Sequence, residues 1–173
     1  MSDLAKLHYA GHLVCQVRNP SGLQTILNEF FRLKVRIREF IGHWLLLPEN
    51  GRCHLGQSPA TGTLGTSCIV GARVWDCQSK FRIILGPLDL GDYLRFLPGG
   101  ESLKRLVDWV RNYVGDSLAW DVNLVLKKAE VPKLELGKMG QLGWTTWLAS
   151  YPHIEDADDL VLNPFISPPQ PHQ

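Results

Sequence analysis

The stretch that decides the fold is Glu101–Lys127, ESLKRLVDWVRNYVGDSLAWDVNLVLK. Its first part spaces apolar residues three and four apart, which predicts a helix over 101–114 with one buried stripe. The stripe consists of Leu103, Leu106, Val107, Val110 and Val114. Gly115 then stands where a left-handed C-terminal cap favours glycine. From Trp120 to Lys127 apolar residues alternate, so Val122, Leu124 and Leu126 are expected on one face of a strand.

An earlier stretch of the chain repeats this order. Ser21–Phe31 is predicted as a helix, with Ser21 and Gln24 spaced as a capping box. Its apolar stripe is Leu23, Ile26, Leu27 and Phe30. The next residues, Lys34–Phe40, alternate charged and apolar side chains as in a half-buried strand. Two similar halves, each an apolar helix followed by a charged strand, predict an α+β fold.

The segment between these halves is less regular. Pro48–Ser67 contains four glycines and no periodicity, and a loop of that length is commonly functional or disordered. Ile69–Val74 and Lys80–Leu85 are predicted strands, and Gly86-Pro87 is expected to end the second. Asp3–Gln16 and Leu90–Phe96 are predicted helices.

The sequence changes character after Trp147, which predicts a domain over 1–148 and a tail over 149–173. Prolines at 164, 168, 169 and 171 exclude a helix or central strand, so the tail is expected to be extended. Its apolar run between acidic and proline-rich flanks is typical of a docking peptide. The alternative, that the tail packs back on its own domain, remains open.

Length, charge and cysteine content limit the class of protein. The chain has 173 residues, a formal net charge of +1 and 45% hydrophobic residues, which fits one domain or one domain with a tail. Near-neutral charge gives no indication of nucleic acid or an anionic membrane as a partner. The four cysteines form no C-x-x-C pair, which favours a reducing cytosolic compartment. No apolar run reaches the roughly 20 residues of a membrane span.

Candidate catalytic and metal-binding residues are few. His8 and His12 are four apart on a predicted helix, but no third ligand accompanies them. Cys77 lies near Lys80 and Arg82, whose charges could lower its thiol pKa, but no histidine stands beside it.

Two candidate functions follow from charged residues. Asp76 and Asp89 could form a hydrolase-like carboxylate pair. Lys34, Arg36 and Arg38 could bind nucleic acid, although such a row more often protects an edge strand.

The chain is rich in tryptophan, with six residues at positions 44, 75, 109, 120, 144 and 147. Tryptophan buries a large area and is enriched among interface anchors. Trp109 lies off the apolar stripe of its helix and is therefore expected to face a second layer or a partner.

Five strings in order resemble the C-terminal half of the type VI secretion baseplate subunit TssG, also called ImpH or VasB. They are VWDCQSKFRIILGPL (74–88), YLRFLPGG (93–100), LVDWVRNYVG (106–115), LAWDVNLVLKKAEVP (118–132) and LGWTTWL (142–148). The stretch YAGHLVCQVRNPSGLQTILNEFF (9–31) resembles the entry to that half, so the likeness covers residues 4 to 148. Members of the family are about twice as long, which implies that the N-terminal half is missing here. Cys77 stands where members often have Arg, which weakens any thiol role for it.

The resemblance implies a non-enzymatic structural subunit with no cofactor. It implies packing with two copies of TssF in a wedge and docking of TssK trimers through extended apolar segments. It also implies a cytoplasmic location in bacteria, at a baseplate associated with the inner membrane, without nucleic acid or direct membrane contact.

These expectations select two sets of residues. The tail is expected to be the first docking segment and the loop 48–67 the second, and the expected partner-binding residues are Leu160, Val161, Leu162, Pro164, Phe165, Ile166, Trp144 and Trp147. The expected structural corner consists of Trp75, Asp76, Gln78, Lys80 and Arg82. In it Asp76 should cap the turn, and Phe81, Ile83 and Leu85 should point into the core. Arg82 should point out of the sheet, toward a partner or a carboxylate.

Overall fold

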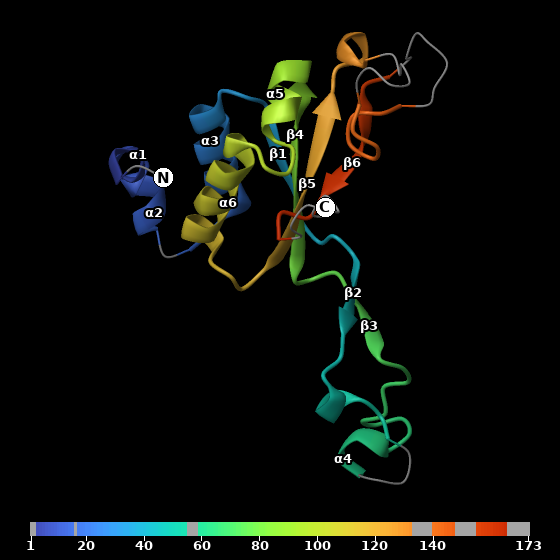
Figure 1. Ribbon diagram of the computed structural model, residues 1–173. Helices are drawn as coiled ribbons and strands as arrows, with labels where there is room; N and C mark the ends of the chain where they lie inside the picture. The colour runs from blue at the N-terminus through green and yellow to red at the C-terminus, as the bar shows by residue number, and fades with distance from the viewer. Residues whose placement is uncertain (1–2, 16, 55–58, 133–139, 148–154, 166–173) are drawn as a thin grey trace, which may run out of the picture. The chain divides into compact units, whose positions relative to one another are not determined.

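The computed structural model describes residues 3–15, 17–54, 59–132, 140–147 and 155–165, and it divides into two units (Figure 1). Residues 1–39 and 81–173 form one unit, called here the sheet unit. Phe40–Lys80 forms the other, called the hairpin unit. Helices and strands are both abundant, so the predicted α+β class is confirmed.

In the part of the sheet unit that the structure describes, four strands pair in the order β1-β4-β5-β6. The strands are β1 (Val35–Arg38), β4 (Lys80–Leu88), β5 (Ala119–Leu126) and β6 (Ala157–Leu162). β1 pairs antiparallel with β4, and β6 pairs antiparallel with β5. On β4, Arg82 contacts Asp121 of β5, and the Leu88 carbonyl accepts a hydrogen bond from the amide of Lys127, directly after β5. At both points the partner lies 39 residues later in the chain, so the residue numbers rise in the same direction along the two strands. β4 and β5 therefore run parallel.

A parallel pair needs a crossover, and α5 (Leu90–Arg95) and α6 (Glu101–Val114) supply it. α6 has the predicted bounds, and the strand after it, β5, begins one residue earlier than predicted. Gly115 ends α6 with φ 78° and ψ −156°, a backbone conformation that glycine adopts more easily than other residues. The expected glycine stop is confirmed, but its conformation is not the left-handed helical one.

The N-terminal helices differ from prediction in two places. α3 (Pro20–Phe31) is capped by Asn19, whose side chain accepts a hydrogen bond from the Gly22 amide at 2.6 Å. The predicted capping box is wrong because Pro20 occupies the first helical position and places Ser21 inside the helix. The predicted single helix over 3–16 is two helices, α1 (Asp3–His8) and α2 (Ala10–Val14), interrupted at the buried Tyr9.

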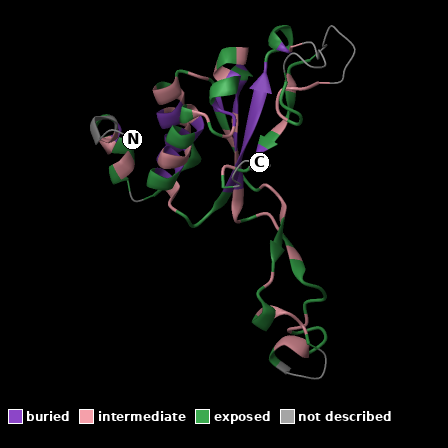
Figure 2. Ribbon diagram, in the orientation of Figure 1, coloured by how far each residue is buried: buried purple, intermediate pink, exposed green. Residues whose placement is uncertain are grey.

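The core of the sheet unit lies where the helices pack on the sheet (Figure 2). The helices contribute Leu23, Ile26, Leu27, Leu106 and Val110, and the strands contribute Ile83, Leu85, Val122, Leu124 and Leu126. Trp109 is fully buried and makes edge-to-face contacts with Tyr9 and Phe30, with ring centroids 5.2 and 5.3 Å away. It therefore faces the unit's own helical layer and is not accessible to a partner.

β4 continues past the point where it was expected to end. The Gly86-Pro87 bond is cis, and the strand runs on to Leu88, so the predicted stop at Leu85 is wrong. A Cβ atom on Gly86 would lie 2.5 Å from the Val125 carbonyl oxygen, so glycine permits β4 to approach β5 closely here. Phe81, Ile83 and Leu85 are buried, as the alternation predicted.

Part of the tail belongs to the sheet. Residues 157–162 form β6 on the edge of β5, and Leu162 is buried in the core. These residues therefore pack on their own domain. Of the two alternatives for the tail, a docking peptide or a segment that packs back, the structure has the latter here. A short 3₁₀ turn, η2 (Lys128–Glu130), follows β5.

The hairpin unit contains the antiparallel pair β2 (His43–Leu46) and β3 (Arg73–Asp76). β3 begins four residues later and ends two residues later than the predicted strand 69–74. The loop predicted over 48–67 contains a 3₁₀ turn, η1 (Glu49–Gly51), and a short helix, α4 (Pro59–Gly62). Within the described ranges of both units, no helix is long and apolar enough to cross a bilayer.

Candidate partner interface

The turn after β3 is held by the side chain of Asp76. Its carboxylate accepts hydrogen bonds from the backbone amides of Gln78 at 3.0 Å and Ser79 at 3.2 Å, and from the Ser79 hydroxyl. These bonds, first that from the Ser79 hydroxyl and then that from the Gln78 amide, lower the pKa of Asp76. The predicted capping role of Asp76 is confirmed.

Directly before this turn, two tryptophans face each other across the hairpin. Trp44 and Trp75 are cross-strand partners, with ring centroids 5.3 Å apart in an edge-to-face arrangement. Trp75 also covers Gly42, where an added Cβ would lie 2.1 Å from its ring. The two residues nevertheless remain 61% and 55% exposed, so their rings contact each other but are not covered by the unit.

Other apolar side chains of the hairpin unit are exposed as well. Leu45 and Leu46 follow Trp44 on β2, so apolar groups are exposed on both faces of the strand pair. The complete set of exposed large apolar residues described in this unit is Phe40, Trp44, Leu45, Leu46, Leu64, Ile69, Val70 and Trp75. We call the part of this set on β2 and β3, namely Trp44, Leu45, Leu46 and Trp75, the hairpin patch.

The hairpin patch is the feature that the sequence interpretation missed. Apolar residues occupy the successive positions 44–47, so they fall on both faces of a strand and give no alternation. The signal for a strand pair was present in two short runs, HWLL (43–46) and RVWD (73–76), each of which contains one tryptophan. The long glycine-containing segment between them concealed the pairing.

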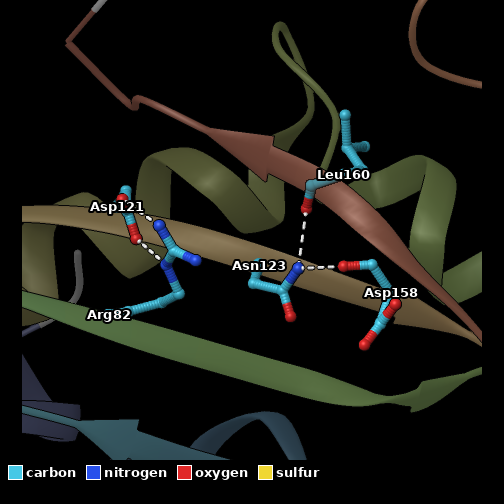
Figure 3. A network of polar contacts seen from close by, with 5 residues as sticks. All are labelled: Arg82, Asp121, Asn123, Asp158 and Leu160. Carbon is cyan, nitrogen blue, oxygen red and sulfur yellow. Dashed lines mark hydrogen bonds and ion pairs between the residues drawn. The ribbon is translucent and has the colours of Figure 1, made fainter. Parts of the chain in front are cut away.

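Arg82, in the sheet unit, points toward a carboxylate, one of the two predicted outcomes (Figure 3). Its guanidinium donates to both oxygens of Asp121, at 2.6 and 2.9 Å, and these bonds raise the pKa of Arg82. The Asp121 side chain is almost fully buried, whereas that of Arg82 is partly exposed. The bidentate pair joins β4 to β5 and supplies a buried carboxylate with its counter-ion.

The neighbouring polar residue on β5 anchors β6 (Figure 3). The Asn123 side-chain amide donates to the carbonyls of Asp158 at 2.6 Å and Leu160 at 3.1 Å. Asn123 is buried, so these bonds satisfy a polar group that would otherwise be costly inside the protein. They also attach the edge strand by its backbone.

The expected partner-binding residues of the C-terminal region differ in accessibility. Trp144 and Trp147 are half-buried against the core: the Tyr93 hydroxyl donates to the Trp144 carbonyl at 2.8 Å, and the Trp147 indole donates to Asp159 at 3.2 Å. Burial, and secondarily the charge of Asp159, raises the pKa of Tyr93. Leu160 also packs partly against the core, and Pro164 is half-buried, whereas Val161 and Phe165 are exposed. Ile166 lies outside the described residues.

The residues of the alternative functions have separate surroundings. Asp89 pairs with Lys127 in the sheet unit, and Asp76 holds the turn of the hairpin unit. Lys34, Arg36 and Arg38 are exposed beside or on β1, at the edge of the sheet. Among the residues that the structure describes, no three His, Cys, Asp or Glu side chains are grouped as a metal site.

Comparison with known proteins identifies the family. The family described as "Type VI secretion, TssG" matches residues 1–149 of the chain. The chain belongs to this TssG family. No curated protein sequence matches it.

Two solved structures share the fold of this TssG-family chain. One is a chain of a type VI secretion TssK-TssF-TssG baseplate subcomplex, with a TM-score of 0.69 and 15% identity, covering 97% of this chain and 70% of that chain. The other is a chain of a type VI secretion baseplate complex, with a TM-score of 0.58 and 18% identity, covering 97% of this chain and 48% of that chain.

Proposed function

We propose that this chain is a non-enzymatic structural subunit of the type VI secretion baseplate, which packs with TssF and docks TssK through exposed apolar side chains. The observation that carries the proposal is the exposed Trp44–Trp75 pair of the hairpin unit. Membership of the TssG family, and a shared fold with a chain of a TssK-TssF-TssG subcomplex, support it. The proposal includes a cytoplasmic location in bacteria, at a baseplate associated with the inner membrane, and neither nucleic acid nor direct membrane contact.

The energetics of the hairpin support a docking role. A two-stranded hairpin is marginally stable in water unless a further surface covers it. At about 250 Å² for a whole tryptophan, the exposed fractions of Trp44 and Trp75 amount to roughly 290 Å². The largest exposed apolar patch of a typical monomer is about 300–600 Å² and is often functional, and these two residues alone come close to that range. Tryptophan is also among the side chains most enriched at interface hot spots.

The polar groups of the 74–88 stretch support a structural role over a catalytic one. The Asp76 carboxylate accepts three hydrogen bonds from its own turn, and these favour the ionised form. Arg82 is paired with Asp121 inside the fold. Both side chains therefore stabilise the backbone. This structural role accounts for the density of polar groups in the 74–88 stretch without a catalytic role.

The order of the two docking segments follows from burial. Leu162 is buried and Leu160 is half-buried in the sheet unit, so part of the tail's apolar run is already used by its own core. Among the described residues of its unit, none covers the hairpin patch to a comparable extent. We therefore assign TssK docking first to the hairpin patch and second to Val161 and Phe165. This differs from the order expected from sequence, which put the tail first and the loop 48–67, outside the hairpin patch, second.

Co-purification with TssK tests the proposal. The tagged chain and TssK are co-expressed, and the ratio of captured TssK to chain is compared between wild type and Trp44→Ala/Trp75→Ala. Hot-spot losses of about 2 kcal/mol or more predict at least about 30-fold weaker binding. Leu94→Ala is the matched control, since Leu94 is exposed to a similar degree, at 46%, but lies on α5 of the sheet unit.

The variants separate the possible outcomes. Loss with the tryptophan variant and retention with Leu94→Ala supports docking by the hairpin patch. Retention with the tryptophan variant but loss with Val161→Ser moves the docking site to the tail. Full retention of TssK by all three variants, or no capture of TssK by the wild-type chain, contradicts the proposal.

A further inference from the structure

The part of the hairpin unit between β2 and β3 contains two cysteines in contact. The Sγ atoms of Cys53 and Cys68 lie 3.3 Å apart, and both residues are half-buried free thiols. Cys68 is positioned by a tight turn in which the amides of Thr66, Ser67 and Cys68 all donate to the Thr63 carbonyl at 3.0–3.2 Å. On the other side, the Arg52 side chain donates to the Leu47 carbonyl at 3.0 Å directly before Cys53. Both thiols are therefore held by local backbone structure.

We propose that Cys53 and Cys68 form a redox-active pair, which a small-molecule disulfide of the glutathione class converts to an intramolecular disulfide. A thiolate of the pair attacks one sulfur of the oxidant and releases one thiol. The second thiolate then attacks the mixed disulfide and releases the second thiol. The protein loses two protons and two electrons, and the oxidant is reduced to two thiols.

The distance between the two sulfur atoms is short enough for this reaction. A disulfide has an S–S length of about 2.05 Å, so the two sulfurs must approach by about 1.3 Å, a distance that small side-chain rotations can cover. The hydrogen bond between the thiols, followed by burial and by the charge that a Cys68 thiolate would carry, raises the pKa of Cys53. Oxidation is therefore expected to be faster at mildly alkaline pH than at neutral pH, because the thiolate is the attacking species.

The other two cysteines have different surroundings. The Cys15 thiol is exposed and donates to the Gly11 carbonyl, four residues earlier. Cys77 lies in the turn that Asp76 caps. The disulfide between Cys53 and Cys68 would join two points 15 residues apart and so hold together the two sides of this segment. This inference concerns the covalent state of the chain and stands whether or not the hairpin patch docks a partner.

Peptide mapping gives a direct test, because trypsin cleaves after Arg52 and Arg73 and leaves both cysteines in the single peptide 53–73. The full chain is incubated with oxidised glutathione, quenched in acid, alkylated with iodoacetamide and digested. The expected product is peptide 53–73 lighter by two hydrogens, about 2 Da, and free of alkyl groups. The peptides with Cys15 and Cys77 should carry either an alkyl group or a glutathione.

A matched variant and a simplified background make the result decisive. In Cys53→Ser, Cys68 should stop at the mixed disulfide with glutathione, since the second attack has no nucleophile. In Cys15→Ser/Cys77→Ser, the intramolecular product should form with an unchanged yield. The proposal is overturned if peptide 53–73 carries two alkyl groups or two glutathiones under conditions that modify Cys15. It is equally overturned if either cysteine is found linked to Cys15, Cys77 or a second chain.

Discussion

Two aromatic pairs with nearly the same geometry lie in opposite environments. Trp109 meets Phe30 with centroids 5.3 Å apart and planes at 67°, and Trp44 meets Trp75 at 5.3 Å and 72°. Trp109 is fully buried, whereas Trp44 is 61% exposed. The ring contact itself is therefore the same, and the difference in hydrophobic stabilisation comes from what covers the rest of each ring. In the sheet unit the tryptophan stabilises the fold; in the hairpin unit most of that contribution is still available to a partner.

The largest expected effect tests the buried member of this comparison. Trp109→Ala should lower the free energy of unfolding by about 3–5 kcal/mol, because it removes a large side chain and leaves a cavity. Urea unfolding followed by circular dichroism measures the change. Trp109→Phe is the control: the buried indole Nε1 has no hydrogen-bond partner among the described residues, so its loss should cost only roughly 1–2 kcal/mol. An equal cost for both variants would contradict the packing explanation.

A second prediction asks whether the sheet unit depends on polar as well as apolar burial. Arg82→Ala should destabilise the protein by about 2–3 kcal/mol, less than the loss of a fully buried ion pair, because Arg82 is partly exposed. Arg82→Lys keeps the charge but not the bidentate geometry, so an intermediate cost is expected in the same urea titration. If Arg82→Lys is as stable as the wild type, the charge and not the paired hydrogen bonds matters.

A third prediction concerns the attachment of β6. Asn123→Ala removes the donor to the Asp158 and Leu160 carbonyls and should cost about 1–3 kcal/mol. Hydrogen exchange at the β6 amides should rise more than at the amides of α6, because the edge strand loses its side-chain anchor. Asn123→Asp serves as the control that keeps the size of the side chain but removes its donors. Unchanged exchange in β6 for both variants would show that backbone pairing alone holds the strand.

The same comparison explains which parts of the fold were predictable from sequence. The helix over 101–114 and the strand after it were predicted almost to the residue. Their apolar residues recur at the regular spacing of a helix or a strand, and that spacing defines a single face that packs against the core. The cap of α3 was assigned to the wrong residue because Ser21 and Asn19 both suit a cap, and Pro20 decides between them. The end of β4 was misplaced because Gly86 and Pro87 usually end a strand, whereas here glycine allows close approach to β5.

The candidate interface was predictable only in part. Asp76 was assigned correctly as a turn cap, because short-range chemistry suffices for that role. For Arg82, strand alternation predicted a partner or a carboxylate as its contact, and the structure has the carboxylate of Asp121. The position of the exposed tryptophans depended on β2 pairing with β3 across a long intervening segment, which periodicity cannot show. The tail illustrates the same limit: its apolar run fits a docking peptide or an edge strand equally well, and the donors of Asn123 on β5 favour the strand.

A fourth prediction tests the exposed member of the opening comparison. Trp44→Ala should lower the free energy of unfolding by about 1–2 kcal/mol, less than Trp109→Ala, because more than half of Trp44 is already exposed to water in the free chain. The urea titration used for Trp109→Ala measures it under the same conditions. A loss comparable to that of Trp109→Ala would mean that the Trp44–Trp75 pair stabilises the free protein, and would remove the energetic argument for docking.

The smallest expected effect is local and depends on pH. The pKa of Asp76 is lowered in the folded state, so its stabilisation of the turn is fully present above the unfolded value of about 3.9 and is lost as pH falls through the lower folded value. The amides of Gln78 and Ser79, which donate to this carboxylate, should therefore lose their protected NMR signals on acidification below about pH 4. Asp76→Asn keeps an acceptor oxygen but cannot titrate, so its turn should show weaker protection that does not vary with pH. If the wild-type and Asp76→Asn turns respond identically to acid, protonation elsewhere in the chain causes the change. The hairpin unit would then depend on groups other than its own turn carboxylate.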